Sequence, residues 1–260
     1  MSIAQLPDRG VLEVAGSDRA AFLQGLVSND VAAIPPGQAA WAALLTPQGK
    51  WLADFFVIPA GEVLLLDVER AQAAGLAQKL SRFRLRSKVA LRDASAEWQV
   101  HAAWGAAPSG AVIAVPDPRL PGAGWRVLNP TALPTDATAE DYDRHRLTLG
   151  LPDGSRDLEA EKSVLLEGGF DELGGISWTK GCYMGQELTA RTLHEASTRS
   201  GGPFIVINAA TITPETMEEE LFGIEGGDGR SRRVGALEEA HGGTLYIDEI
   251  GDMPRETQNR

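Results

Sequence analysis

The chain has 260 residues, of which 43% are hydrophobic and 23% are charged, a composition that fits one large or two ordinary globular domains and disfavours wholesale disorder. Its formal net charge of -12 gives no bulk attraction to nucleic acid or to an anionic membrane, so neither is expected as a direct partner. The single cysteine excludes an intrachain disulfide, a cysteine-rich metal site and a cluster held only by thiolates of this chain.

The N-terminus predicts where the protein works. Its first residues have neither the apolar core of a signal peptide nor a basic amphipathic pattern. No run in the sequence approaches the ~20 apolar residues that a membrane-spanning helix needs. We therefore expect a cytoplasmic protein.

Up to Leu149, short apolar runs alternate with helical patterns. The expected strands are 11–14, 41–45, 51–58, 63–68, 88–91, 98–104, 111–115 and 125–128, and helices are expected after an N-cap at Ser17 or Asp18, over 69–83 and over 139–149. Proline and glycine in turn positions of Thr46-Pro-Gln-Gly-Lys50 predict a hairpin. This order favours an α+β layer with helices on one side of an antiparallel or mixed sheet.

Two local features are candidates for ligand contacts. Arg84 and Arg86 lie in Arg82-Phe-Arg-Leu-Arg-Ser-Lys88. In a strand, this alternation would place the cations on one face, to hold a carboxylate or phosphate tail or to form a solvated edge. Asp54 interrupts an apolar run, and it either faces water at a strand end or faces a ligand, because a buried acid requires a partner.

The lone thiol, Cys182, lies in a segment rich in glycine. Lys180 is two residues away, and a nearby ammonium lowers the pKa of a thiol and increases its nucleophilicity. Gly181 and Gly185 permit backbone conformations that expose the side chain. The alternative is a small buried hydrophobic residue, the usual environment of a free cysteine.

The longer string Leu173-Gly-Gly-Ile-Ser-Trp-Thr-Lys-Gly-Cys-Tyr-Met-Gly-Gln-Glu187 resembles the signature of the YgfZ family of folate-binding proteins, relatives of the glycine-cleavage aminomethyltransferase (T-protein). Supporting matches occur at 22–30, 45–54 and 84–89, in family order. The resemblance covers residues 1–193 and implies a T-protein-like fold with a cavity for tetrahydrofolate or a derivative. It also implies a role in assembling or repairing iron–sulfur clusters in client enzymes, tRNA-thiolating enzymes among them.

The same resemblance implies roles for individual residues. Cys182 is the functional thiol, and its loop comprises Lys180, Tyr183, Gln186 and Glu187. The expected folate contacts are these loop residues together with Asp54, Arg84 and Arg86. Asp54 falls where the aminomethyltransferases carry an acidic pair, but Ala53 occupies the other position, which argues against aminomethyl transfer. The C-terminal β-barrel of the family does not follow the signature here.

After the signature the chain changes character. From His194 onward there are 13 acids and 6 arginines, and no lysine occurs after Lys180. The expected elements are a strand over 201–208, a helix over 214–222, a polar loop over 225–233, a helix over 234–240 and a strand over 242–249. This alternation predicts a parallel α/β sheet, whose ligands gather at strand C-termini. Asp248 and Glu249 then suit Mg²⁺, although two acids at a strand end also form solvated turns.

This second part resembles the AAA+ sigma-54-interaction domain of response regulators of the NtrX type. The matching strings are 199–210, 220–223 and 242–254, and Asp248 with Glu249 corresponds to the Walker B acids. The phosphate-binding loop requires a lysine, and Gln186 stands at that position. Hydrolysis of ATP is therefore not expected, and the folate-binding part is expected to be non-catalytic or weakly catalytic.

Gly185–Thr192 matches a short run of residues that both families share. This run is therefore a plausible crossover point between a folate-binding domain over 1–193 and a partial AAA+ fragment over 194–260. The first hypothesis is a folate-binding accessory protein for iron–sulfur clusters. The alternative is a fragment of a transcription regulator that binds ATP and Mg²⁺ and contacts sigma-54 RNA polymerase.

Overall fold

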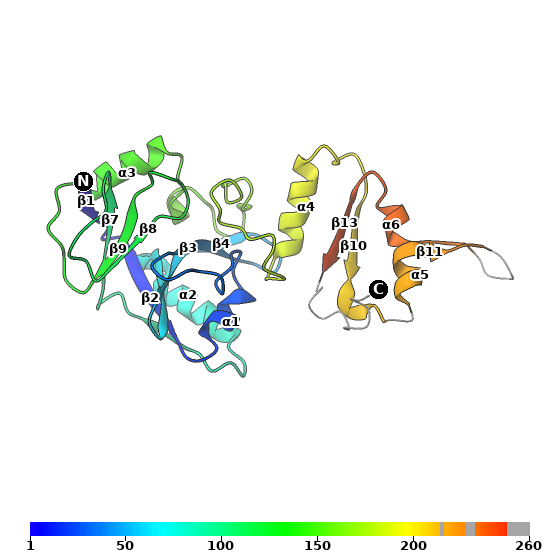
Figure 1. The fold of residues 1–260 in the computed structure, drawn as a ribbon, viewed down its shortest axis with the longest axis horizontal. Helices are drawn as coiled ribbons and strands as arrows, with labels where there is room; N and C mark the ends of the chain where they lie inside the picture. Colours follow the sequence, from blue (N-terminus) through cyan, green and yellow to red (C-terminus); the bar gives the residue numbers. More distant parts are fainter. Residues whose placement is uncertain (214–215, 227–231, 249–260) are drawn as a thin grey trace. The chain divides into compact units, whose positions relative to one another are not determined.

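The computed structural model describes residues 1–213, 216–226 and 232–248 (Figure 1). The chain divides into two compact units, Met1–Lys180 and Gly181–Arg260. This division lies ahead of the domain boundary that the sequence predicts after Leu193.

A five-stranded antiparallel sheet forms the centre of the first unit. Its strand order is β3-β4-β5-β2-β6. The strands are β2 (Arg9–Ala15), β3 (Ala40–Leu45), β4 (Trp51–Ala60), β5 (Val63–Glu69) and β6 (Ala90–Asp93). The expected hairpin joins β3 to β4, with Trp41 opposite Phe56. Phe56 in turn lies opposite Asp67 of β5, which places an aromatic ring and a carboxylate side by side in the centre of the sheet.

Two helices accompany this sheet, α1 (Arg19–Gln24) and α2 (Arg70–Arg82), and α2 packs on β2, β5 and β6 (Figure 1). Ala73, Leu76 and Leu80 are the buried residues of α2, a helical spacing that turns one apolar stripe to the sheet. Asp18 does occupy the N-cap position of α1, but its side chain makes no capping bond. It accepts instead from the Lys88 backbone N–H at 2.7 Å and from the Ser17 hydroxyl at 2.9 Å.

The remaining strands of this unit form a second antiparallel sheet, whose arrangement the sequence did not predict. Its order is β1-β7-β9-β8, built from β1 (Ser2–Gln5), β7 (Gln99–Trp104), β8 (Ile113–Pro116) and β9 (Trp125–Asn129). Helix α3 (Ala139–Thr148) contacts β1 and begins with a capping box between Thr138 and Asp141. The strands up to Leu128 are close to the expected ranges, whereas β1 carried no signal that we recognised.

The segment after α3 is irregular, as expected, apart from the short 3-10 helix η1 (Gly154–Arg156). It folds back on the five-stranded sheet, where Phe170 stacks on Trp41 with ring centroids 3.9 Å apart. The Ser28 hydroxyl donates to the Gly175 carbonyl at 2.6 Å. A side chain at position 175 would meet Trp41 at 2.8 Å, so glycine is required for this close approach.

The second unit has a parallel pair of strands, β10 (Phe204–Asn208) and β13 (Thr244–Asp248), which confirms the predicted parallel α/β arrangement. Its other elements are α4 (Gln186–Ala196), η2 (Ala209–Thr211), α5 (Met217–Phe222), β11 (Gly223–Ile224), β12 (Arg233–Val234) and α6 (Ala236–Glu239). None of the helices in the described part of the chain has the length and apolar character of a membrane span.

Candidate functional site

The most concentrated group of buried charges lies where the two sheets of the first unit meet. Arg9 of β2 donates through Nε to Asp67 Oδ1 at 2.7 Å, and Arg126 of β9 places Nη1 3.3 Å from Asp67 Oδ2. All three side chains are buried. Burial opposes the charged form of Arg9, but Asp67 and other carboxylates outweigh this and raise its pKa. One carboxylate therefore holds two guanidinium groups and joins the sheets through them.

A second ion pair extends this network over an aromatic surface. Arg119 contacts both carboxylate oxygens of Asp117, at 2.9 and 2.7 Å. Its guanidinium carbon lies 4.9 Å from the centroid of Phe56, and that of Arg126 lies 4.2 Å from the same ring. The Tyr142 hydroxyl accepts from Arg126 at 3.0 Å. Cation–π contacts thus offset part of the lost hydration of both arginines, and charge-assisted hydrogen bonds do the same for Arg119. Within the described residues, Nε and Nη1 of Arg126 have no hydrogen-bond partner.

Asp54, the carboxylate expected at a folate site, is buried in β4 beneath this network. It accepts the indole N–H of Trp41 at 2.8 Å and that of Trp51 at 3.2 Å. Burial raises its pKa, although the charge of Arg9 and the Trp41 bond act in the opposite direction. Of the two readings of Asp54, a strand-end residue facing water is wrong, because two neighbouring indoles enclose the carboxylate.

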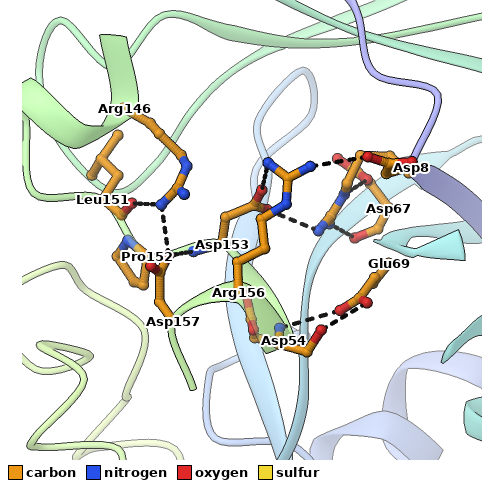
Figure 2. A network of polar contacts seen from close by, with 12 residues as sticks. Asp8, Asp54, Asp67, Glu69, Arg146, Leu151, Pro152, Asp153, Arg156 and Asp157 are labelled. Atoms are coloured by element: carbon orange, nitrogen blue, oxygen red, sulfur yellow. Dashed lines mark hydrogen bonds and ion pairs between the residues drawn. The ribbon is translucent and has the colours of Figure 1, made fainter. Parts of the chain in front are cut away.

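The 151–157 segment covers the network and is held by charges along its length (Figure 2). Arg146 of α3 donates to the Leu151 carbonyl and to Asp157, and Arg119 donates to the Pro152 carbonyl. Ser155 donates to Glu69 at 2.8 Å. At Gly154, an added side chain would meet Glu69 at 3.0 Å and Asp54 at 4.0 Å, so the segment passes directly over both acids.

A cavity of about 340 Å³ opens beside this segment. Its lining combines acids and arginines: Asp8, Arg9, Glu69, Arg70, Asp153 and Arg156, with Ala71. Arg156 reaches Asp8 at 2.9 Å, and Arg9 reaches Asp153 at 3.4 Å (Figure 2). A volume in this range is typical of small-molecule sites, and the mixed lining suits a ligand that carries both polar donors and carboxylates.

Lys180 closes the first unit. Its ammonium donates to the carbonyl oxygens of Gln24, Val27 and Asn29 at 2.5, 2.6 and 3.0 Å. Burial lowers its pKa to about 8, with Asp30 acting in the opposite direction. The ammonium of Lys180 therefore fixes the last residue of α1 and the loop that follows this helix. Sequence reasoning did not assign this role to Lys180.

The rest of the signature loop belongs to the second unit. Cys182 is exposed, while Tyr183 is buried, and Gln186 begins α4 with its side chain accepting from the Tyr183 N–H at 3.3 Å. Gly181 and Gly185 both have φ +84°, the left-handed conformation that favours glycine. The exposed alternative for Cys182 is therefore the one that the structure shows.

Several of the predicted site residues of the second unit influence the pKa of Tyr246 in β13. Burial raises its pKa, and the acidic groups of Asp248, Cys182, Tyr183 and Glu187 raise it further. Helix α4, which begins at Gln186 of the signature loop, contacts β13. Asp248 ends β13 beside Asn208 of the parallel strand, as a Walker B acid would, whereas Glu249 lies outside the described residues.

Arg84 and Arg86 do not lie in a strand, so the prediction of one cationic strand face is wrong. The chain leaves α2 in a turn, closed by the Ser87 N–H donating to the Arg84 carbonyl at 2.7 Å, and β6 begins only at Ala90. Both arginines are exposed. The structure does not bring them together with Asp54, which is buried in β4.

The central charges of the first unit were missed. Arg9, Asp67, Arg119 and Arg126 carry no motif, and the available signal was a charge inside an apolar strand, as in Val63-Leu-Leu-Leu-Asp-Val-Glu69. A buried charge requires a partner, so Asp67 could have been marked from its pattern. Among the residues that the structure describes, no three His, Cys, Asp or Glu side chains gather as a metal site would require.

Known proteins match the two parts of the chain separately. An iron–sulfur cluster assembly factor, the mitochondrial IBA57 homolog of Mycosarcoma maydis, is 37% identical over 221 residues, which is 76% of this chain and 55% of that protein. The family model of the sigma-54 interaction domain matches residues 179–260. The nitrogen assimilation regulatory protein NtrX of Azorhizobium caulinodans is 72% identical over 76 residues, 29% of this chain and 17% of that protein.

Among solved structures, the glycine cleavage system aminomethyltransferase T from Bartonella henselae is similar at a TM-score of 0.40 and 14% identity, covering 85% of this chain and 56% of that one. The chain spans about half the length of the IBA57 relative. Its larger part is similar to this relative, and its first unit has an α+β fold with two antiparallel sheets. This region is IBA57-like, and it is joined to a short sigma-54 interaction segment like that of NtrX.

Proposed function

We propose that this chain is an accessory factor for the assembly or repair of iron–sulfur clusters and that its first unit binds a folate. The observation that carries the proposal is the 37% identity to an iron–sulfur cluster assembly factor over 221 residues. The exposed thiol of Cys182 supports it, since a thiol that acts on another protein must be accessible.

The proposed folate site is the cavity beside the 151–157 segment, with Asp54 below it. Tetrahydrofolate or a derivative offers ring N–H groups for the acids of the cavity and carboxylates for its arginines. Arg156 is half-exposed and can turn from Asp8 toward a ligand carboxylate without breaking a buried pair. Arg84 and Arg86 stay a predicted second contact for the carboxylate tail.

Titration calorimetry of the full chain with 5-formyltetrahydrofolate tests this site. Arg156→Ala should weaken binding about tenfold, the effect of one lost charge-assisted contact of about 1.4 kcal/mol. Arg144→Ala is the matched control, because Arg144 is an exposed arginine of α3 whose ion pairs within the described residues are with its helix neighbours Glu140 and Asp141. Equal affinities of the two variants would place the folate elsewhere, and the R84A/R86A variant would then decide whether the turn holds it.

The proposed role in cluster assembly needs its own test. An apo enzyme that takes a four-iron cluster is reconstituted without air, in the presence of the full chain or of Cys182→Ser, and its visible absorbance is followed. We expect the chain to accelerate recovery and the C182S variant to lose this effect. If both act equally, the thiol is not the functional group. Clients that thiolate tRNA are part of the proposal.

The proposal also includes a cytoplasmic location, although the IBA57 relatives are named as mitochondrial proteins. Fractionation of the source cells followed by immunoblotting checks this location, and recovery of the protein in a membrane or organelle fraction would refute it.

A second candidate function follows from the parallel pair β10 and β13, with Asp248 at the strand end. We infer that this segment descends from a regulator that binds ATP with Mg²⁺ and contacts sigma-54 RNA polymerase. Because Gln186 stands in place of the phosphate-binding lysine, we expect a fluorescent ATP analogue to show no saturable binding. Clear saturation that requires Mg²⁺ would favour this second function.

A further inference from the structure

The turn between α2 and β6 presents an unusual combination of side chains. Residues 82–88 carry four cations and no acid, in a chain with a net charge of -12. Between the cations stand two large apolar residues, Phe83, which is 40% exposed, and Leu85, which is 90% exposed. We call residues 82–88 the basic turn. The exposed apolar side chains distinguish the basic turn from an ordinary solvated surface, because charged side chains alone are enough to keep a surface soluble.

The basic turn is held at both ends. At the start, the Phe83 N–H donates to the Leu80 carbonyl of α2 at 3.0 Å. At the end, the Lys88 N–H donates to Asp18 at 2.7 Å. Gly16 adjoins this end so closely that an added side chain would meet the Lys88 carbonyl at 2.0 Å. A turn fixed in this way loses little conformational entropy when a partner binds.

Leu85 is held in a conformation that costs energy. Its φ is +41°, which a leucine adopts only against steric resistance. Backbone strain of this kind is concentrated at functional positions. Burial of the side chain does not explain the strain, because Leu85 is the most exposed of the large hydrophobic residues that the structure describes.

In the part of the chain that the structure describes, the cations of the basic turn form no close ion pair, and the neighbouring carboxylate of Asp18 accepts from the Lys88 backbone N–H. Within the described residues no ion pair involves Arg82, Arg84, Arg86 or Lys88, whereas the buried arginines are all paired: Arg9, Arg119, Arg126 and Arg146. Beside the turn, Asp18, Leu85, Arg86 and Ser87 line an open depression of about 720 Å³. The surface therefore offers unpaired positive charge around a hollow that contains an apolar side chain.

We propose that the basic turn is a docking site for an acidic segment of a partner protein that inserts an apolar side chain beside Leu85. Carboxylates of that segment pair with Arg84 and Arg86, and its apolar side chain fills the depression. Charge complementarity selects an acidic partner, and the exposed Leu85 favours a polypeptide over nucleic acid, whose backbone offers no apolar match. This docking goes beyond folate binding in the cavity beside the 151–157 segment, and it competes with the alternative use of Arg84 and Arg86 as a second contact for the folate tail.

Fluorescence anisotropy with the full chain tests the proposal. The probe is a labelled oligoglutamate peptide interrupted by a Leu-Phe pair. Arg86→Glu should weaken its binding at least about tenfold, and Leu85→Ser about fivefold, while raised salt weakens binding to the unsubstituted chain. Arg144→Glu is the matched control, since it reverses the charge of another exposed arginine, and it should change the affinity less than about twofold.

Several outcomes would overturn the proposal. An uninterrupted oligoglutamate that binds equally well removes the role of Leu85, and R144E that weakens binding as much as R86E reduces the effect to net charge. Single-stranded RNA that binds more tightly than the peptide makes the occupant a nucleic acid. Displacement of the peptide by 5-formyltetrahydrofolate would show that the basic turn binds the folate tail. Sedimentation that shows self-association, abolished by R86E, would show that the basic turn binds a second copy of the chain.

Discussion

Replacement of Asp67 by asparagine tests the network that joins the two sheets. Asp67 is fully buried, accepts a hydrogen bond from Arg9 at 2.7 Å and forms an ion pair with Arg126 at 3.3 Å. Asparagine keeps the size of the side chain but removes its charge, and it leaves two buried guanidinium groups to share fewer acids. Loss of one partner from a buried ion pair costs about 3–5 kcal/mol.

The lower end of this range is expected for Asp67→Asn. Arg9 keeps the backbone carbonyl of residue 67 at 2.7 Å and Asp153 at 3.4 Å, and Arg126 keeps Tyr142 at 3.0 Å. These contacts remain after the substitution and hold both cations in place. We therefore expect the free energy of unfolding of the first unit to fall by about 3 kcal/mol.

Urea denaturation followed by tryptophan fluorescence measures this change. All six tryptophans lie before Lys180, so the signal reports on the first unit alone. Asp8→Asn is the matched control, because Asp8 pairs with Arg156 at 2.9 Å at the surface, where such a pair contributes about 1 kcal/mol or less. If the two variants shift the midpoint equally, Asp67 does not hold the sheets together.

Three further substitutions have defined outcomes. Burial lowers the pKa of His101, so its side chain is neutral in the folded chain. The free energy of unfolding should therefore fall as pH drops below about 6.5. In urea titrations, His101→Gln should flatten this part of the pH profile. Gly16→Ala should lower the melting temperature in calorimetry, because φ is +110° and the new side chain would meet the Lys88 carbonyl at 2.0 Å. The strained backbone alone costs about 1–3 kcal/mol. An unchanged melting temperature would show that the backbone of residues 88–89 moves away without cost. Lys180→Met leaves three carbonyl oxygens without their shared donor and should cost about 1–3 kcal/mol by tryptophan fluorescence, whereas no loss would mean that water replaces the ammonium.

The sequence predicted local structure more completely than it predicted long-range contacts. The hairpin at β3 and β4 and the helix α2 follow from turn residues and apolar spacing, which act over a few positions. The pairing of Asp67 with Arg9 and Arg126 joins residues far apart in the chain, and no local pattern encodes it. The same reason explains β1, whose identity as a strand depends on pairing with β7.

The basic turn shows how a local pattern can mislead. Its alternation of cations with Phe83 and Leu85 is typical of a strand edge, yet a strand needs a partner with free backbone groups. The Ser87 N–H bonds within the turn instead, and the positive φ of Leu85 breaks the extended backbone. The signature loop is the opposite case, since its long motif predicts the similarity to iron–sulfur cluster assembly factors that the comparisons show, and its glycines permit the exposed conformation of the thiol.

Titration of the full chain with 5-formyltetrahydrofolate, after circular dichroism has shown that the protein is folded, tests the proposed function most directly. The account predicts saturable heat with one site per chain and affinity that falls about tenfold in Arg156→Ala. A folded chain that gives no heat at any accessible folate concentration would contradict it.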